Sequence, residues 1–206
     1  MLPDRVLVRP ATAEDADAVV ELLLHLPGGL VDVLGDRTAA RRVARVIFRR
    51  RRSLFSAGRT FVADEGGRVV GLMVVVGRDE WARGRIPTGF AMLRGAGPRR
   101  AWRVAWRGPL EERLVPPIPS DASHVVALSV VPDRRGSGIG SELLRHAVRV
   151  ASAWGNRRVT LDVGARNVGA IRLYQRQGFL TVSEHHRPAM RGWAAATSFR
   201  MERAVE

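Results

Sequence analysis

The chain has 206 residues, of which 46% are hydrophobic and 26% are charged, so its composition is that of a globular protein with one core. It contains no cysteine, which excludes disulfides, thiolate metal sites and a cysteine nucleophile. It also contains no lysine, which excludes a Walker phosphate loop, and no apolar run approaches the roughly 20 residues that span a bilayer.

The net charge of +14 comes from arginine, because all 34 basic residues are arginines, spread along the chain with one run at 49–52. Such a run can contact phosphates, but a chain-wide excess of one residue type is better explained by compositional bias. Nucleic acid and membrane are therefore disfavoured as partners. The first residues lack the order of a signal peptide, so we expect a cytoplasmic protein, and a homodimer stays open.

Before residue 77, hydrophobic periodicity predicts a strand, two helices and a hairpin. The strand lies at 6–8, and the first helix runs from a cap at Thr12 to Leu23. The second helix lies at 38–52, and the hairpin strands lie at 60–63 and 69–76. The second helix is strongly basic, and we interpret its arginines as a solvated face.

Between residues 77 and 120 the pattern changes to glycine, proline and arginine around large aromatic residues. We interpret this stretch as an insertion within a single domain over 1–206, and we predict that it forms a lid over the substrate. Trp102 and Trp106 have helical spacing and are interpreted as core or lid packing.

The rest of the chain predicts a strand, a helix, a strand and a helix in tandem, followed by two antiparallel edge strands. These elements lie at 124–131, 139–154, 158–163, 167–178, 179–185 and 197–203. Two strands joined by helical crossovers imply a parallel or mixed sheet. Trp154 is expected on the buried face of its helix. His185 and His186 are adjacent on a strand and face opposite sides, so no metal site is predicted.

A glycine-rich turn over 135–140 joins the strand at 124–131 to the helix that follows it. Unpaired amides and the positive end of the helix dipole favour an anion at such a turn, and a diphosphate fits there. The alternative is a tight turn without a ligand. A nicotinamide site is disfavoured, because the spacing is G-x-G-x-G and Ser141 stands where the dinucleotide motif needs its third glycine.

The run Arg135-Gly136-Ser137-Gly138-Ile139-Gly140 is followed about thirty residues later by a helix that starts at Asn167 and carries Tyr174 before Gly178-Phe179. These two linked motifs resemble those of the GNAT superfamily of N-acetyltransferases, most strongly over 123–179. The resemblance implies an α/β fold with a mixed, mostly antiparallel central sheet, a splayed parallel strand pair and flanking helices.

The resemblance also implies acetyl-CoA as co-substrate, no metal, and direct transfer of the acetyl group to a primary amine. A small-molecule amine is favoured over a protein amino terminus, and the acceptor's identity stays open. The alternative is a module without turnover that senses acyl-CoA or associates with nucleic acid.

In proteins of this superfamily the pantetheine arm runs beside the fourth strand, which implies main-chain contacts with Leu128, Ser129 and Val130. The Val130 N–H is the implied donor to the thioester oxygen. Asn167 is implied to bind the cofactor from the other side of the cleft, or simply to cap its helix. The pyrophosphate is implied to lie on the turn and helix start, at Arg135, Gly136, Ser137, Gly138, Ile139, Gly140 and Ser141.

Three side chains are candidates for proton transfer. Tyr174, the one tyrosine of the chain, is implied as the general acid that protonates the departing thiolate, and ring packing is the alternative. His124 and Asp162 are the candidate bases for the attacking amine, and water is a third option.

Overall fold

A computed structural model describes residues 6–98, 100–101, 104–105, 116–187 and 196–205. Within these residues the chain forms one sheet in the order β1-β2-β3-β4-β5-β7-β6. Only the β4–β5 pair is parallel. The strands are β1 (Leu7–Pro10), β2 (Thr60–Glu65), β3 (Arg68–Gly77), β4 (Ala122–Val130), β5 (Arg158–Gly164), β6 (Leu180–Arg187) and β7 (Ala196–Ala204).

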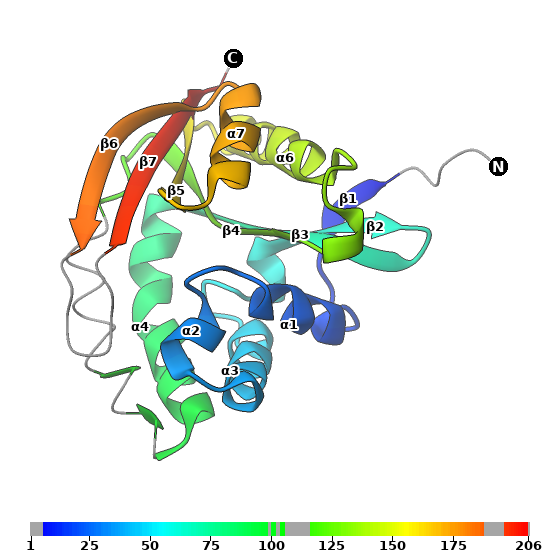
Figure 1. The fold of residues 1–206 in the computed structure, drawn as a ribbon, viewed down its shortest axis with the longest axis vertical. Helices are drawn as coiled ribbons and strands as arrows, with labels where there is room; N and C mark the ends of the chain where they lie inside the picture. Colours follow the sequence, from blue (N-terminus) through cyan, green and yellow to red (C-terminus); the bar gives the residue numbers. More distant parts are fainter. Residues whose placement is uncertain (1–5, 99, 102–103, 106–115, 188–195, 206) are drawn as a thin grey trace.

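Helices cover both faces of this sheet (Figure 1). They are α1 (Ala16–Leu24), α2 (Leu30–Leu34), α3 (Arg37–Arg49), α4 (Arg78–Ala96), α6 (Ile139–Ala153) and α7 (Val168–Arg176), with short 3-10 turns η1 (Ala57–Arg59) and η2 (Pro132–Arg134). α6 and α7 lie on one face and α1 to α4 on the other (Figure 1). Among the helices described, none has both the length and the hydropathy to cross a membrane.

The alternation of side chains along β3 divides the core between the two faces. Met73 and Val75 pack with α6, whereas Leu72 and Val74 pack with α1. The sheet is therefore a buried middle layer between the two sets of helices.

β4 and β5 separate partway along their length. They pair in parallel only from Ala122 opposite Arg158 to Val125 opposite Leu161, although β4 continues to Val130. At the same point the register between β3 and β4 shifts, because Val74 pairs with Ala127 and Val75 with Val125. This bulge bends β4 away from β5. The predicted mixed sheet with a splayed parallel pair is confirmed.

Helix α4 is the largest difference from the sequence-based expectation, which gave 77–120 no helix of this length. Two of its glycines lie where a neighbouring segment comes too close for a side chain. A Cβ on Gly84 would be 2.5 Å from Leu54 Cδ2, and one on Gly95 would be 2.9 Å from Val43 Cα. Packing on α3 and on Leu54 therefore stabilises a helix that its residue propensities disfavour.

Smaller corrections concern three positions. β7 lies between β5 and β6, so only β6 of this pair is an edge strand. Trp154 is 45% exposed, because α6 ends at Ala153 and leaves the indole beyond its buried face. α1 starts after Asp15, not at Thr12, since the Asp15 carboxylate accepts the Thr12 N–H at 2.7 Å and pairs with Arg9 at 2.8 Å. Trp102 and Trp106 lie outside the described residues.

Candidate active site

The opening between β4 and β5 exposes main-chain groups of β4. In an antiparallel ladder, alternate residues direct both their N–H and their C=O toward the partner strand. The Val131 N–H donates to Val70 O at 3.0 Å, so Ser129 also faces β3, while Leu128 and Val130 face the opening. The Arg135 Nε donates to Val130 O at 3.3 Å, which places that carbonyl on the open side.

The turn before α6 presents its amides to solvent. Gly136 and Gly138 have φ of 83° and 89°, a region that other residues rarely adopt, and a Cβ on either would meet nothing within 4 Å. The helix begins with the Glu142 N–H donating to Gly138 O at 3.1 Å. No acceptor among the described residues takes the amides of 136–141. The turn therefore fits a diphosphate, the group predicted for it.

Side chains at the turn support its shape. Ser137 donates its hydroxyl to Arg134 O at 2.6 Å, and Arg134 pairs with Glu65 on β2. Gly140 brings α6 close to α7, because a Cβ there would be 2.9 Å from Leu173 Cδ2. The two motifs that are far apart in sequence are thus adjacent in the fold.

Asn167 is the N-cap of α7. Its Oδ1 accepts the Ala170 N–H at 3.3 Å, as Asn does at many helix starts. The capping role is therefore present, and it leaves the amide group of the side chain for a ligand.

Tyr174 lies on α7 and is 8% exposed. Its ring is 6.1 Å from that of Phe179, and it packs in the cluster that holds Val125 of β4 and Val163 of β5. Burial raises the pKa of Tyr174 to about 12. The phenol therefore keeps its proton throughout the neutral range, as a general acid requires.

The two candidate bases lie beside each other. His124 is buried, with Nδ1 2.9 Å from Thr160 Oγ1 and Nε2 3.8 Å from Asp162 Oδ2. The pKa of His124 is lowered to about 4, chiefly by burial, with Asp162 raising it and the charge of Arg200 lowering it. The imidazole is therefore neutral at pH 7, the form that accepts a proton.

Arg200 completes this group and was missed by the sequence prediction. It is 3% exposed and faces Asp162 across the β5–β7 ladder. Its Nε lies 2.6 Å from Oδ1 of Asp162 and its Nη2 2.9 Å from Oδ2, a bidentate pair. Its Nη2 and Nη1 also donate to Pro116 O at 3.0 Å and Pro117 O at 3.4 Å. No local pattern indicates this role, although an arginine beside the buried Met201 in a strand is a weak signal.

His185 and His186 do not come together with other ligands. Nε2 of His185 is 2.8 Å from Ser183 Oγ, and Nδ1 of His186 is 3.1 Å from Thr197 Oγ1. In the described part of the chain, no group of three His, Cys, Asp or Glu residues is placed to hold a metal ion.

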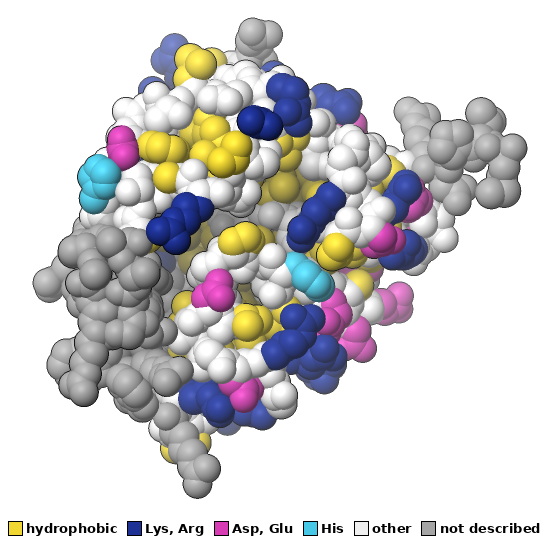
Figure 2. Space-filling model, in the orientation of Figure 1, with side chains coloured by type: hydrophobic (Ala, Val, Ile, Leu, Met, Phe, Trp, Pro, Cys, Tyr) yellow, Lys and Arg dark blue, Asp and Glu magenta, His cyan; other side chains and the backbone are white. Residues whose placement is uncertain are grey.

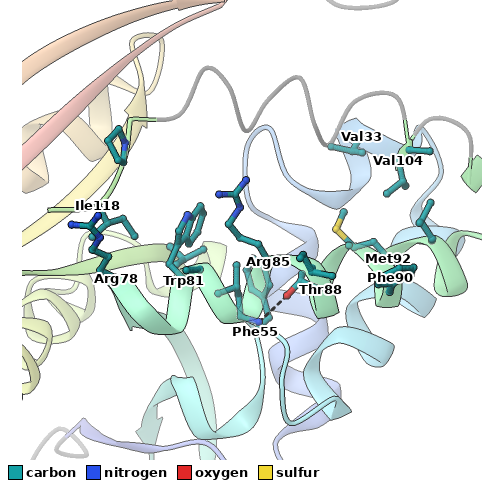
Figure 3. A pocket seen from close by; sticks show the side chains of 18 of the residues that line it. Val33, Phe55, Arg78, Trp81, Arg85, Thr88, Phe90, Met92, Val104 and Ile118 are labelled. Atoms are coloured by element: carbon teal, nitrogen blue, oxygen red, sulfur yellow. Dashed lines mark hydrogen bonds between the residues drawn. The ribbon is translucent and has the colours of Figure 1, made fainter. Parts of the chain in front are cut away.

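A cavity of about 840 Å³ lies along α4 and reaches β4 at Val126 (Figure 3). Its wall also includes Pro116 and Pro117, whose carbonyls Arg200 holds, and Trp81, whose ring stands edge-on to His124 at 5.8 Å. Sequence reasoning did not find this cavity, because its wall comes from segments distant in sequence.

A central sheet with a splayed parallel pair, an amide-lined turn at its opening and a buried, protonated phenol nearby define the class of acyl-CoA-binding acyltransferase folds. The family model described as "Acetyltransferase (GNAT) family" matches residues 36–179. The chain belongs to this family, whose enzymes use acetyl-CoA as co-substrate.

Two curated relatives match shorter segments. An uncharacterized N-acetyltransferase of Methanocaldococcus jannaschii is 35% identical over 88 residues, which cover 43% of this chain and 34% of that protein. The N-alpha-acetyltransferase MAK3 of Arabidopsis thaliana is 39% identical over 57 residues, 28% of this chain and 30% of that protein. The matches thus span about a third of each relative.

Solved structures agree over the whole fold. The crystal structure of an N-acetyltransferase from Staphylococcus aureus Mu50 has a TM-score of 0.65 and 16% identity, over 96% of this chain and all of that one. At this identity the likeness concerns the fold.

Proposed function

We propose that this protein is an acetyl-CoA-dependent N-acetyltransferase whose acceptor is a small-molecule primary amine. Family membership supports acetyl transfer. The observation that favours a small molecule is the cavity of about 840 Å³ beside β4, since cavities of roughly 300–1,000 Å³ suit ligands of drug size. A protein amino terminus would instead need an open groove for an extended chain.

The residues that hold acetyl-CoA are those that offer unpaired main-chain groups. The amides of 136–141 bind the pyrophosphate, Leu128 and Val130 bond to the pantetheine arm, and the Val130 N–H faces the thioester oxygen. The main chain of Ser129, also predicted to contact the pantetheine arm, belongs to the ladder with β3. Bound acetyl-CoA supplies an activated acetyl group at the opening of the sheet.

Proton transfer is assigned to Tyr174 and His124. The phenol of Tyr174 is the acid for the leaving thiolate, and its high pKa keeps it protonated and neutral. Arg200 donates to both carboxylate oxygens of Asp162, so the amine proton is assigned to the neutral His124. A protonated His124 would be stabilised by Asp162 at 3.8 Å.

The test is a panel of amines incubated with the purified protein and acetyl-CoA, with products read by mass spectrometry and free thiol by absorbance. We expect acetylation of small primary amines and much slower acetylation of peptides with free amino termini. Preferred acetylation of peptides would contradict the small-molecule assignment. Tight acetyl-CoA binding without turnover of any amine would support the sensor alternative.

A further inference from the structure

The cavity has one end close to the reacting centre. β3 pairs Val76 with His124 and Gly77 with Ser123, so Arg78, the next residue, starts α4 beside the candidate base. Figure 3 shows Arg78 and Trp81 at the Ile118 end of the cavity, with Val33, Met92 and Val104 at the other end. An acceptor amine that reaches His124 must therefore lie at the end that carries Arg78.

Apart from Arg85 and Thr88, the rest of the described lining is apolar, and it is partly open to solvent. Ile86 is 70% exposed and Phe90 is 62% exposed, although both face the cavity. The polar Thr88 is already bonded, since its hydroxyl accepts the Leu54 N–H at 2.9 Å and donates to Gly84 O at 2.6 Å. An apolar ligand body would cover this surface and gain free energy in proportion to the area buried.

The charged side chains among the described lining residues are of one sign. Arg78 and Arg85 are its charged members, and no aspartate or glutamate is among the described lining residues. Arg78 makes no hydrogen bond or ion pair with a described residue, and its side chain is exposed to the cavity. A polyamine or another polycation would be repelled here, whereas a carboxylate would pair with Arg78 in the bidentate manner that guanidinium groups favour.

We propose that the acceptor is an α-amino acid with a large apolar side chain. This inference rests on the proposed function and adds the substrate class. The carboxylate lies on Arg78, the neighbouring amine lies near His124, and the side chain follows α4 toward Met92. The amine nitrogen bonds to the acetyl carbon as the C–S bond breaks. Tyr174 gives its proton to the sulfur, and the amine proton leaves to His124 or water.

Matched substrates test the carboxylate. L-phenylalanine, phenethylamine and glycine are compared with acetyl-CoA in excess, because the second lacks the carboxylate and the third lacks the apolar body. We expect kcat/KM for phenylalanine to exceed that for either by about 10- to 100-fold, the range for one charge-assisted pair or one buried ring. Equal or better use of phenethylamine would overturn the proposal while leaving the N-acetyltransferase function in place.

Arg78→Gln identifies the partner of the carboxylate. The variant should raise KM for phenylalanine by about tenfold or more and bring the phenylalanine-to-phenethylamine ratio close to one. Arg83→Gln is the matched control, since Arg83 lies on the same helix, is exposed and does not line the cavity. A ratio that survives in Arg78→Gln, or that falls equally in Arg83→Gln, would contradict the role of Arg78.

Product binding keeps the test independent of turnover. Calorimetry with CoA present compares N-acetylphenylalanine with N-acetylphenethylamine on the wild type. We expect the carboxylate-bearing product to bind about tenfold more tightly or better, and this preference to disappear in Arg78→Gln. Equal binding of the two compounds by the wild type would overturn the proposal even if no amine is turned over.

Discussion

Helices α6 and α4 approach β4 from opposite faces of the sheet and contribute different chemical groups (Figure 1). The turn before α6 and the start of the helix offer main-chain amides, and the turn needs glycine at 136 and 138 because φ is positive there. α4 offers side chains, and its glycines at 84 and 95 are there because neighbours leave no room. We call the turn at 135–141 with α6 the cofactor half, and α4 with the cavity the acceptor half. Under the proposed function, side chains other than the glycines can change in the cofactor half with little effect on acetyl-CoA binding. In the acceptor half, substitutions along the cavity would change which amine is accepted.

The largest effect is expected at Tyr174, which belongs to neither half but acts between them. Tyr174→Phe keeps the ring packing and removes the proton, so kcat should fall by roughly 10²- to 10⁴-fold with little change in acetyl-CoA affinity. Since the phenol titrates near pH 12, the wild type should show no loss of activity from its ionisation below about pH 10. A variant with wild-type kcat would return Tyr174 to ring packing alone.

The cofactor half is tested at Gly138, where a side chain meets an unfavourable φ and a carboxylate would face the pyrophosphate. Gly138→Asp should weaken acetyl-CoA binding by about 100-fold in calorimetry, and Gly138→Ala by less, because only the first adds a negative charge. Gly155→Ala introduces similar strain at the far end of α6, where φ is 71°. Equal losses of affinity in all three variants would show that strain, not the amide site, sets binding.

Local signals explain why the cofactor half could be predicted. The turn, its helix and the helix of Tyr174 are contiguous in sequence, and their caps and glycines act within a few residues. The core pattern at Leu143 and Ala147 repeats with the helical period, so α6 was found within one residue of its end. The position of the splayed pair followed from the resemblance, not from the periodicity.

The acceptor half could not be predicted, because nonlocal contacts build it. Gly84, Pro87, Gly89 and Gly95 lower the helix propensity of α4, and only its fit to α3 and Leu54 compensates. The pairing of Arg200 with Asp162 depends on the register between β5 and β7. The sequence pattern could not predict that register, because β7 was expected to be an edge strand and instead lies between β5 and β6.

The buried His124 should make the stability of the fold depend on pH. Its pKa of about 4 in the fold is below the value of about 6.5 in an unfolded chain, so the unfolded state binds more protons between these values. Stability should therefore fall as pH drops from about 6.5 to 4, by on the order of 2–3 kcal/mol. In denaturant titrations His124→Gln should lose this part of the pH dependence, and His186→Gln, at an exposed position, should keep it. An unchanged slope in His124→Gln would contradict the buried, neutral imidazole.

The packing of α4 is tested by two glycine substitutions with opposite expected signs. Gly95→Ala places a methyl group against the main chain of Val43, so it should destabilise the protein by about 1–3 kcal/mol. Gly89 lies in the same helix, and a Cβ there would meet nothing within 4 Å. Gly89→Ala should therefore stabilise the protein by about 0.5–1 kcal/mol. Thermal unfolding of both variants measures the difference. The same sign for both would mean that α4 does not pack as described.

The smallest effect is expected at the basic run. Arginine side chains are spread over both halves of the visible face (Figure 2), and those at 49–52 are exposed. Replacing all four with glutamine should leave acetyl-CoA affinity and kcat within about twofold of the wild type, as surface changes usually do. Duplex or RNA binding by the wild type that disappears in this variant would instead favour the nucleic-acid-associated alternative.

The break between β4 and β5 leaves polar groups of a central strand unpaired, a condition that sheets otherwise confine to their edges. Under the proposed function, a diffusible metabolite supplies the missing pairing, so it acts as a removable structural part. A ligand present at 100 times its Kd adds about 2.7 kcal/mol to the stability of the fold it binds. The unliganded protein should therefore unfold more readily than the liganded one, and its midpoint of thermal unfolding should rise with acetyl-CoA concentration.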